Sequence, residues 1–432
     1  MKRLLIISPH FPPANTADMQ RVRMSLPYFA NLGWEAEVIT VAPTYDDVVK
    51  DELLLASVPA NIKIHQVKAL TKKWTSKLGL GSLALRSLWY FRKKGNQLLK
   101  QQRFDLIYFS TTEFPICILG SYWKKRFGTP YVIDMQDPWH TDYYKNKPKS
   151  ERPKKYWFSY RLHKYLEPKA MQHVDGLISV SENYIQTLHL RYPQLQTKPA
   201  AVITFGAFDK DFEIAQQNSK QLGLAFRQTT NKINLIYIGR GGFDMKPALQ
   251  TLFGAFKQGI ALQPDLFGKV QFHFIGTSYA PKGKGVPTIA PIAEELGLSD
   301  YITEYTDRIG FYQSLKNMQQ ADGLVIIGSD QAAYTASKLY PYILAKKPLL
   351  ATLHPESSAT KIMKDCHAGH LLYINQTLDA ATQTMAAYLE FIHQHVPPPT
   401  RWEAFETFTA AHTTQKQVEL FNEVIKNNAV PL

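Results

Sequence analysis

The chain has 432 residues, of which 45% are hydrophobic and 20% charged, so it can hold two domains with ordinary cores and is not disordered. No run of about 18 apolar residues exists, so no transmembrane helix is expected. The basic, apolar start is interrupted by prolines from Pro9 onward, too early for a signal peptide. Cys117 and Cys366 lie far apart, which favours a reducing cytoplasm over a disulfide.

The formal net charge of +14 belongs entirely to the first half of the chain. Residues 1–205 hold 30 Lys and Arg against 16 Asp and Glu, whereas residues 206–432 hold 20 of each. The basic runs at 68–103 and 143–169 also contain tryptophans and tyrosines, which suits an anionic membrane surface or nucleic acid. No nucleic-acid motif is present. We therefore expect no nucleic acid, and either a peripheral position on the inner face of the cell membrane or an ordinary solvated basic face.

Strand-like runs alternate with helical patterns, as in parallel sheets built from βαβ units. In the first half, strands are expected at 4–7, 37–41, 106–109, 131–133, 177–180 and 200–204, with a helix over 19–32 that ends in a left-handed cap at Gly33. In the second half, strands are expected at 235–238, 270–275, 324–327, 349–352 and 371–374. The sequence predicts an α/β protein with domains at 1–207 and 208–400 and a C-terminal amphipathic segment at 401–432.

The segment around Lys338 predicts an anion site. Pro341 is tolerated only in the first turn of a helix, so a helix must begin within about one turn of it. Lys338 and the preceding hydroxyl residues then lie at a helix N-terminus, where free N–H groups and the helix dipole favour phosphate. The loop at residues 8–18 has a similar placement after the first strand. Two such entrances suggest two facing α/β domains with a ligand between them.

A glycine turn follows the strand at 235–238 and carries one arginine. Arg240 can offer a guanidinium fork to a diphosphate. Gly241 and Gly242 would allow close backbone approach to phosphate, or they simply make a tight turn.

Further segments follow strands: Asp134-Met135-Gln136-Asp137-Pro138-Trp139, Ser179-Val180-Ser181-Glu182 and Phe272-His273-Phe274-Ile275-Gly276-Thr277. Together with Phe11-Pro12-Pro13, the glycine turn and Ser337-Lys338-Leu339, in this order, they resemble the GT-B glycosyltransferases of the family 4 type. The resemblance covers nearly the whole chain. It implies two Rossmann-like domains, a last helix that crosses back to the N-terminal domain, and a retaining enzyme that uses a nucleotide-diphosphate sugar of the UDP or GDP type.

The resemblance implies a donor site in the second domain, formed by Gly239, Arg240, Gly241, Lys246, Thr277, Arg308, Thr335, Ser337, Lys338 and Leu339. On the acceptor side it points to Asp137 and His10 as catalytic candidates, with Thr16, Asp134 and His140 near them. Asp137 could orient the acceptor hydroxyl or accept its proton; it could equally cap the loop before Pro138. His10 could line the cleft or be an exposed loop histidine without a role.

One departure from the family concerns its two glutamates, eight residues apart around the last phosphate loop. They fall near Ala333 and at Pro341 here, and neither residue is acidic. Asp330 or Tyr334 could replace one of them. Alternatively, this branch holds its donor differently or has lost activity.

No metal or cofactor is expected. No His/Cys cluster has metal-ligand spacing, and the formal D-x-D at Asp209–Asp211 is expected to be a turn in the domain junction. The sequence therefore predicts transfer of a sugar from a nucleotide-diphosphate sugar to a glycan or lipid-linked acceptor in surface polysaccharide assembly. The alternatives are a UDP-sugar 2-epimerase of the same fold and a non-catalytic nucleotide-sugar-binding relic.

Overall fold

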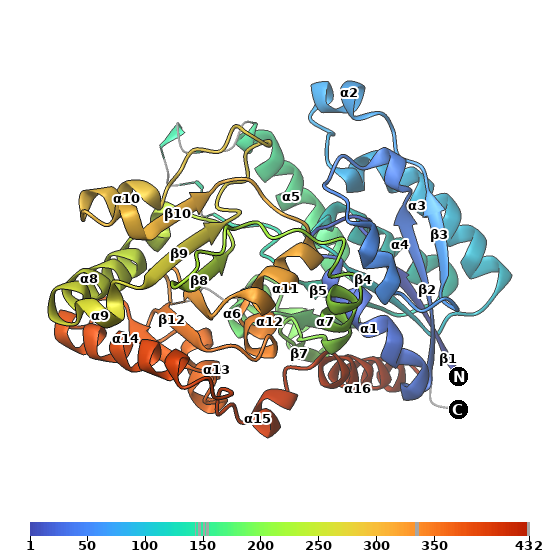
Figure 1. Ribbon diagram of the computed structural model, residues 1–432. Coiled ribbons are helices and arrows are strands. Elements are labelled where there is room, and N and C mark those ends of the chain that lie inside the picture. The colour runs from blue at the N-terminus through green and yellow to red at the C-terminus, as the bar shows by residue number, and fades with distance from the viewer. Residues whose placement is uncertain (143, 146–147, 150–151, 153–154, 333–336, 430–432) are drawn as a thin grey trace. The chain divides into compact units, whose positions relative to one another are not determined.

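The computed structural model describes the chain except residues 143, 146–147, 150–151, 153–154, 333–336 and 430–432. It divides into two compact units, the first formed by Met1–Gly206 with Phe408–Leu432 and the second by Ala207–Thr407. Each unit contains one sheet, labelled in Figure 1.

The first unit is built on a parallel sheet of seven strands in the order β3-β2-β1-β4-β5-β6-β7. Its central strands are buried on both faces, which explains why they read as continuous apolar runs. The strands are β1 (Lys2–Ile7), β2 (Trp34–Val41), β3 (Lys63–Val67), β4 (Leu106–Ser110), β5 (Tyr131–Met135), β6 (Gly176–Ser179) and β7 (Ala200–Val202).

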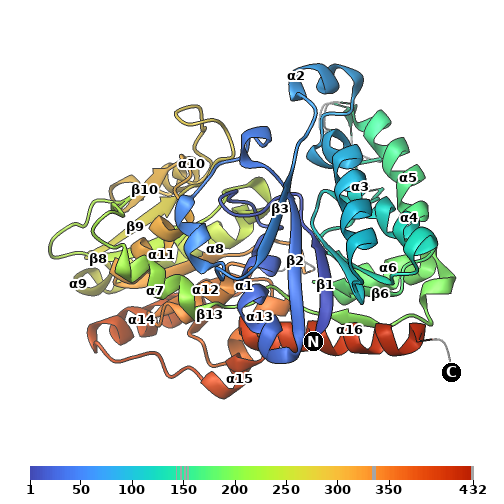
Figure 2. The ribbon, with the colours of Figure 1, turned by 90° about the vertical axis from the view of Figure 1, so that its right-hand side faces the viewer.

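Successive strand residues point to opposite faces of the sheet. Both faces of this sheet carry apolar side chains, and helices cover both of them. Leu5 and Ile7 of β1 pack in one core, and Leu4 and Ile6 pack in the other. The first core contains side chains of α3, α4 and α5, which Figure 2 shows on one side of the sheet. The helices of the unit are α1 (Gln20–Phe29), α2 (Lys72–Thr75), α3 (Leu83–Gln101), α4 (Ile118–Phe127), α5 (Tyr156–Met171), α6 (Glu182–Arg191) and α16 (Ala410–Asn428).

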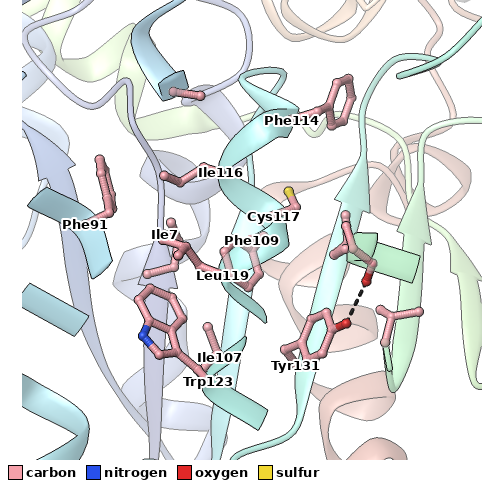
Figure 3. Close-up of a cluster of buried hydrophobic side chains, with 14 of the residues drawn as sticks. Ile7, Phe91, Ile107, Phe109, Phe114, Ile116, Cys117, Leu119, Trp123 and Tyr131 are labelled. Atoms are coloured by element: carbon pink, nitrogen blue, oxygen red, sulfur yellow. Dashed lines mark hydrogen bonds between the residues drawn. The ribbon is translucent and has the colours of Figure 1, made fainter. Parts of the chain in front are cut away.

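Aromatic rings fill the first of these cores, as Figure 3 shows. Trp123 of α4 stacks on Phe109 of β4, with ring centroids 6.1 Å apart. Gly95 of α3 lies against the Trp123 ring, where a Cβ would collide with it. Tyr131 donates its hydroxyl to the carbonyl of Ala170 at 2.6 Å, which ties β5 to α5.

The C-terminal helix α16 belongs to the first unit although its sequence follows the second. It packs beside α1, where Phe421 is fully buried and lies 5.7 Å from Trp34 and 5.0 Å from Tyr108, measured between ring centroids. Gln417 donates to Ser25 of α1 at 2.9 Å. The predicted return of the last helix to the N-terminal domain is therefore confirmed.

The second unit has a parallel six-stranded sheet in the order β10-β9-β8-β11-β12-β13. The strands are β8 (Ile233–Ile238), β9 (Val270–Ile275), β10 (Ile302–Tyr305), β11 (Gly323–Ile327), β12 (Leu349–Leu353) and β13 (His370–Tyr373). The helices are α7 (Asp209–Gln217), α8 (Lys246–Leu262), α9 (Pro264–Phe267), α10 (Ala290–Glu295), α11 (Phe311–Gln320), α12 (Leu339–Leu344), α13 (Ser358–Asp365), α14 (Leu378–His393) and α15 (Trp402–Glu406). Together the two sheets confirm the predicted α/β class with two Rossmann-like domains.

Two edge strands, β3 and β10, were not predicted from the sequence, because each is a single short run in which few apolar residues stand among polar ones. The expected helix at 19–32 is α1 followed by a short 3-10 turn (Ala30–Leu32), and Gly33 adopts the expected left-handed conformation with φ of 82°. The expected turn at Asp209–Asp211 is wrong: these residues form the first turn of α7, where Asp211 accepts a hydrogen bond from Tyr312. No helix among the described residues is long and apolar enough to cross a membrane.

Candidate active site

In the second unit, the amino group of Lys338 is held at the end of β8. Lys338 immediately precedes α12, and its Nζ donates to the hydroxyl of Tyr237 at 2.6 Å and lies 4.3 Å from the centre of that ring. Gly239 makes this approach possible. Its φ is +157°, and a Cβ there would collide with Lys338 Nζ. The glycine after the strand therefore brings a lysine amine against the backbone turn.

Tyr342 of α12 fixes this helix to the end of β8. Its hydroxyl accepts the backbone N–H of Ile238 at 2.6 Å and donates to the carbonyl of Ile238 at 3.2 Å. The predicted helix start within one turn of Pro341 is confirmed, since α12 begins at Leu339.

Lys338 sits where its charge is costly. Burial lowers the pKa of the Lys338 ammonium to about 7, the neighbouring Arg240 lowers it further, and only Asp244 opposes them. A buried amine beside a second cation gains from any anion that binds there. This position is therefore suited to phosphate oxygens.

The guanidinium group of Arg240, predicted to meet a diphosphate, is already paired within the protein. Its guanidinium makes a bidentate pair with Asp244, with N–O distances of 2.8 and 2.7 Å. The hydrogen bond and charge of Arg240 lower the pKa of the Asp244 carboxyl. Gly242 is needed beside this pair, because a Cβ there would lie 2.6 Å from both partners.

Two of the predicted donor residues have structural roles. Thr277 donates its hydroxyl to Glu304 at 2.6 Å, and its carbonyl accepts from the N–H of Gly241 at 2.8 Å. The same Glu304 carboxylate accepts the N–H groups of residues 288–290, at the start of α10. Gly241 makes room for the side chain of Thr288. The Thr277 hydroxyl is thus occupied inside the unit.

The remaining donor predictions lie in different environments. Arg308 is exposed and lies over the ring of Tyr279, 5.0 Å from its centre. Ser337 and Lys246 are exposed, Lys246 at the first position of α8. The side chain of Leu339 is buried, so only its backbone could meet a ligand. Thr335, with Ala333 and Tyr334, lies outside the described residues.

In the first unit, His10 lies between two carboxylates at the carboxyl end of the sheet. Its Nδ1 is 3.0 Å from Asp18, and its Nε2 is 3.5 Å from Asp46. Burial alone would lower the pKa of His10, but Asp18, with the charges of Asp46 and Glu113, raises it to about 9. His10 is therefore an imidazolium at neutral pH. An imidazolium has no free lone pair to accept a proton, so His10 is not suited to act as a general base at this pH.

Asp18 is the centre of this cluster. Besides His10, it accepts the hydroxyl of Thr111 at 3.0 Å and the N–H of Thr112 at 3.3 Å. Burial would raise the pKa of Asp18, but His10 lowers it, and the hydroxyls of Thr16 and Thr111 add to the effect. Thr16, predicted on the acceptor side, lies in the same loop.

Asp137 follows β5 in an exposed loop. Partial desolvation of its carboxyl group by nearby protein atoms raises the pKa of Asp137, and the charge of Asp18 adds to the rise. Trp139 anchors the loop, because its ring is buried and stacks on Phe114 with centroids 5.5 Å apart. A carboxyl group with a raised pKa, in a loop anchored by a buried ring, is suited to accept a proton.

His140 is held through its backbone. Its N–H donates to Glu167 at 3.0 Å, and its carbonyl accepts from Arg191 at 3.1 Å. Burial lowers the pKa of its imidazole, and the charge of Arg191 lowers it further. Its clearest role is to fix the end of the Asp137 loop.

Asp134 is a structural residue, which corrects its assignment to the acceptor side. It is fully buried within β5 and pairs with Arg21 Nε at 2.7 Å. Ser110 and Gln136 also donate to its Oδ2, at 2.9 and 2.8 Å. These contacts place Asp134 inside the sheet, beneath the loops that could meet an acceptor.

The His10–Asp18 pair predicts a pH dependence of stability. Folding raises the pKa of His10 from about 6.5 to about 9. The contribution of protonated His10 to the free energy of unfolding is therefore complete below pH 6.5 and is lost as the pH rises through 9. Between pH 6 and 9.5 it amounts to at most about 3 kcal/mol. Folding lowers the pKa of Asp18, so the contribution of Asp18 to stability is lost only in acid. We expect His10→Asn to flatten urea-unfolding stability over this range; an unchanged slope, equal to that of the exposed-site control His393→Gln, would contradict it.

Several of these residues were missed by the sequence reading. Asp18 is eight residues beyond His10 in the same loop, so its proximity was a usable signal. Tyr237 and Tyr342 resemble core aromatics in sequence, and nothing local marks their hydroxyls as partners of Lys338 and Ile238. Across the described part of the chain, no group of three or more His, Cys, Asp or Glu side chains could hold a metal ion.

Most of the first unit is similar to a known family of proteins. Residues 20–203 match the family described as "Glycosyl transferase 4-like domain". The matched range contains Thr111, Thr112 and the Asp137 loop. His10 and Asp18 lie before it. The resemblance to GT-B glycosyltransferases of the family 4 type is thereby confirmed.

Solved structures show the same fold over the whole chain. Sucrose-phosphate synthase from Thermosynechococcus elongatus aligns with a TM-score of 0.60 and 14% identity, covering 99% of this chain and 100% of that one. HepE from Anabaena, in complex with UDP-glucose, aligns with a TM-score of 0.56 and 15% identity, covering 98% and 100%. A glycosyltransferase from Rickettsia africae gives a TM-score of 0.59 and 12% identity, covering 99% of each chain. No curated protein matches the sequence.

Proposed function

We propose that the protein transfers a sugar from a nucleotide-diphosphate sugar to a glycan or lipid-linked acceptor. The observation that carries the proposal is the placement of Lys338. The amine of the half-buried Lys338 lies at the end of β8, where it is held by Tyr237 and accommodated by Gly239, beside Arg240 at a strand-to-helix turn. Two neighbouring cations with one carboxylate between them are suited to a diphosphate.

In the proposed transfer, the second unit stabilises the leaving diphosphate. When the bond between the anomeric carbon and the diphosphate oxygen breaks, negative charge grows on the leaving diphosphate. Lys338 and Arg240 would stabilise this charge, and the acceptor hydroxyl oxygen would form the new bond to the anomeric carbon. Because two cations fill this role, we propose that no metal is required. HepE, which shares the fold, binds UDP-glucose, which supports a UDP-type donor here, with GDP as the other candidate.

In the first unit, Asp137 is the proposed acceptor of the hydroxyl proton. Its raised pKa and its anchored loop support this role. The imidazolium of His10 would supply positive charge beside the substrate rather than act as a base. Retention of anomeric configuration is proposed from the family resemblance. We place the activity in surface polysaccharide assembly, at the inner face of the membrane.

A UDP-sugar 2-epimerase is the second candidate, and one observation favours it. The first unit gathers more carboxylates than the sequence revealed, with Asp18, Asp46 and Glu113 around His10 and Asp137 influenced by Asp18. Acid–base chemistry on a sugar ring needs such groups. The match of residues 20–203 to a glycosyl transferase 4-like domain favours transfer.

The test is to incubate the full chain with UDP- and GDP-sugars, with and without a membrane extract as acceptor. Sugar incorporated into the lipid or glycan fraction, with release of nucleotide diphosphate, supports the transferase. A new 2-epimer of the free UDP-sugar without acceptor supports the epimerase. Binding of the donor without either product would leave the non-catalytic relic.

We expect Asp137→Asn to keep donor affinity and to lower sugar transfer by about 10²- to 10⁴-fold, the usual contribution of a positioned proton acceptor. The measurement is kcat at saturating donor, together with donor Kd by calorimetry. Asp142→Asn is the matched control, since Asp142 lies five residues further along the chain with a side chain 59% exposed. Loss of donor binding in Asp137→Asn, with transfer per bound donor unchanged, would show that Asp137 serves the donor instead.

A further inference from the structure

Exposed aromatic side chains gather with cations at one end of the first unit. Trp74 of α2 is 69% exposed and Trp157 of α5 is 65% exposed. Each has a cation over its ring: Lys77 lies 5.1 Å from the Trp74 centroid, and Arg161 lies 5.6 Å from that of Trp157.

The two tryptophans belong to one surface, because their segments are joined. Lys155, just before α5, donates to the carbonyl of Ser76 at 2.8 Å. The ring of Phe158 lies against Gly79, where a Cβ would come within 2.7 Å of it. Figure 2 shows α2 and the start of α5 near each other at the same end of the unit. We call the exposed side chains of Lys72, Lys73, Trp74, Lys77, Lys155, Trp157 and Arg161 the aromatic–basic face.

The aromatic–basic face lies at the edge of the first sheet where its parallel strands end. The segment with α2 follows β3, and α5 follows the long connection after β5. The carboxyl ends of parallel strands meet at one edge of a sheet, so the face lies at the same edge as the loops of His10 and Asp137.

The net positive charge of the first unit favours an anionic partner. Residues 1–205 carry the whole excess of +14, whereas residues 206–432 are neutral. Of the lysines in the face, Lys72 pairs with the exposed Asp47 at 2.9 Å. Tryptophans flanked by lysine and arginine are the residues that sit at the headgroup level of a bilayer.

We infer that the aromatic–basic face docks the protein on an anionic lipid bilayer, with Trp74 and Trp157 inserted at the headgroup level. This deepens the proposed function, since it would bring the Asp137 edge to an acceptor presented in a membrane. Each cation at an anionic surface strengthens binding by about fivefold, and the gain fades within a Debye length.

The experiment is vesicle co-sedimentation of the full chain, with phosphatidylcholine alone or with 30% phosphatidylglycerol. Trp74→Ala/Trp157→Ala should weaken binding to anionic vesicles at least tenfold, and Lys73→Gln/Lys77→Gln should weaken it in low salt only. Trp402→Ala is the matched control, because Trp402 in the neutral unit is 39% exposed and has Lys346 over its ring at 5.2 Å. Circular dichroism and melting curves should match wild type for all variants.

Equal binding to neutral vesicles, an unchanged affinity of the double tryptophan variant, or an equal loss in Trp402→Ala would overturn the inference. Binding to nucleic acid with no affinity for vesicles would assign the face to that partner instead. Because sedimentation is read without donor or acceptor, a failure here leaves the sugar-transfer test unaffected, and the reverse also holds.

Discussion

Replacement of Lys338 by methionine is expected to weaken binding of UDP or GDP by about 10- to 150-fold. A charged hydrogen bond to phosphate is worth roughly 1.5–3 kcal/mol, and the amine is already positioned by Tyr237 at 2.6 Å. Binding of the nucleoside, which lacks phosphate, should change little. Calorimetric titration of nucleoside and nucleoside diphosphate into the wild type and the variant gives both affinities. An equal loss for both ligands would contradict the phosphate role.

The same lysine predicts a pH dependence with a definite sign. Its pKa is about 7 in the free protein because of burial and Arg240, and a diphosphate favours the charged form. Binding above pH 7 must therefore take up a proton, and the wild-type affinity should fall between pH 7 and 8.5. Lys338→Met should lose this dependence.

Arg240→Ala should also weaken diphosphate binding more than nucleoside binding. Asp244→Asn serves as the opposing control. It removes the carboxylate that occupies the Arg240 fork, so it should leave diphosphate affinity equal to or tighter than that of wild type. A loss as large as that of Arg240→Ala would mean that the pair acts as a structural unit only.

Substitution of Arg21 by methionine is expected to lower the free energy of unfolding of the first unit by about 3–5 kcal/mol. Removing one partner of a buried ion pair leaves the other charge uncompensated, and Asp134 is fully buried. Arg21 also donates to the carbonyls of Ile203 and Thr204, at 2.6 and 3.1 Å. The backbone after β7 would lose these donors as well.

Tryptophan emission during urea unfolding gives this measurement. Of the 7 tryptophans, only Trp402 lies in the second unit, so the signal follows the first unit even if the two unfold separately. Lys72→Met is the control, because its pair with Asp47 is more than half exposed on both sides and should contribute less than about 1 kcal/mol. An Arg21→Met stability within this margin would mean that Asp134 is not held as a buried charge, and its acceptor-side assignment would stand again.

The sequence was most informative where local rules are strict. Pro341 indicated the start of α12, Gly33 indicated the left-handed end of the helical segment that begins with α1, and the buried central strands were visible as apolar runs. The edge strands β3 and β10 were not predicted, because each is a short run in which few apolar residues stand among polar ones.

The candidate site was harder to predict from the sequence than the fold, for a physical reason. Residue types and loops could be predicted, but the partners of each side chain are set by tertiary packing. Arg240 was recognised, yet its pairing with Asp244 four residues later was not; His10 was recognised without the carboxylate of Asp18. Asp134 looked like a ligand-facing acid because it follows a strand, whereas its partner Arg21 lies 113 residues away in sequence.

A thermal-shift titration of the full chain with UDP-sugars and GDP-sugars tests the proposed donor site most directly. A nucleotide-diphosphate sugar at 100 times its Kd should stabilise the protein by about 2.7 kcal/mol and raise its melting temperature. The shift should be largely lost in Lys338→Met at the same ligand concentration. If no UDP- or GDP-sugar shifts the wild type, or if the shift is undiminished in Lys338→Met, the second unit does not hold a nucleotide diphosphate in the way proposed.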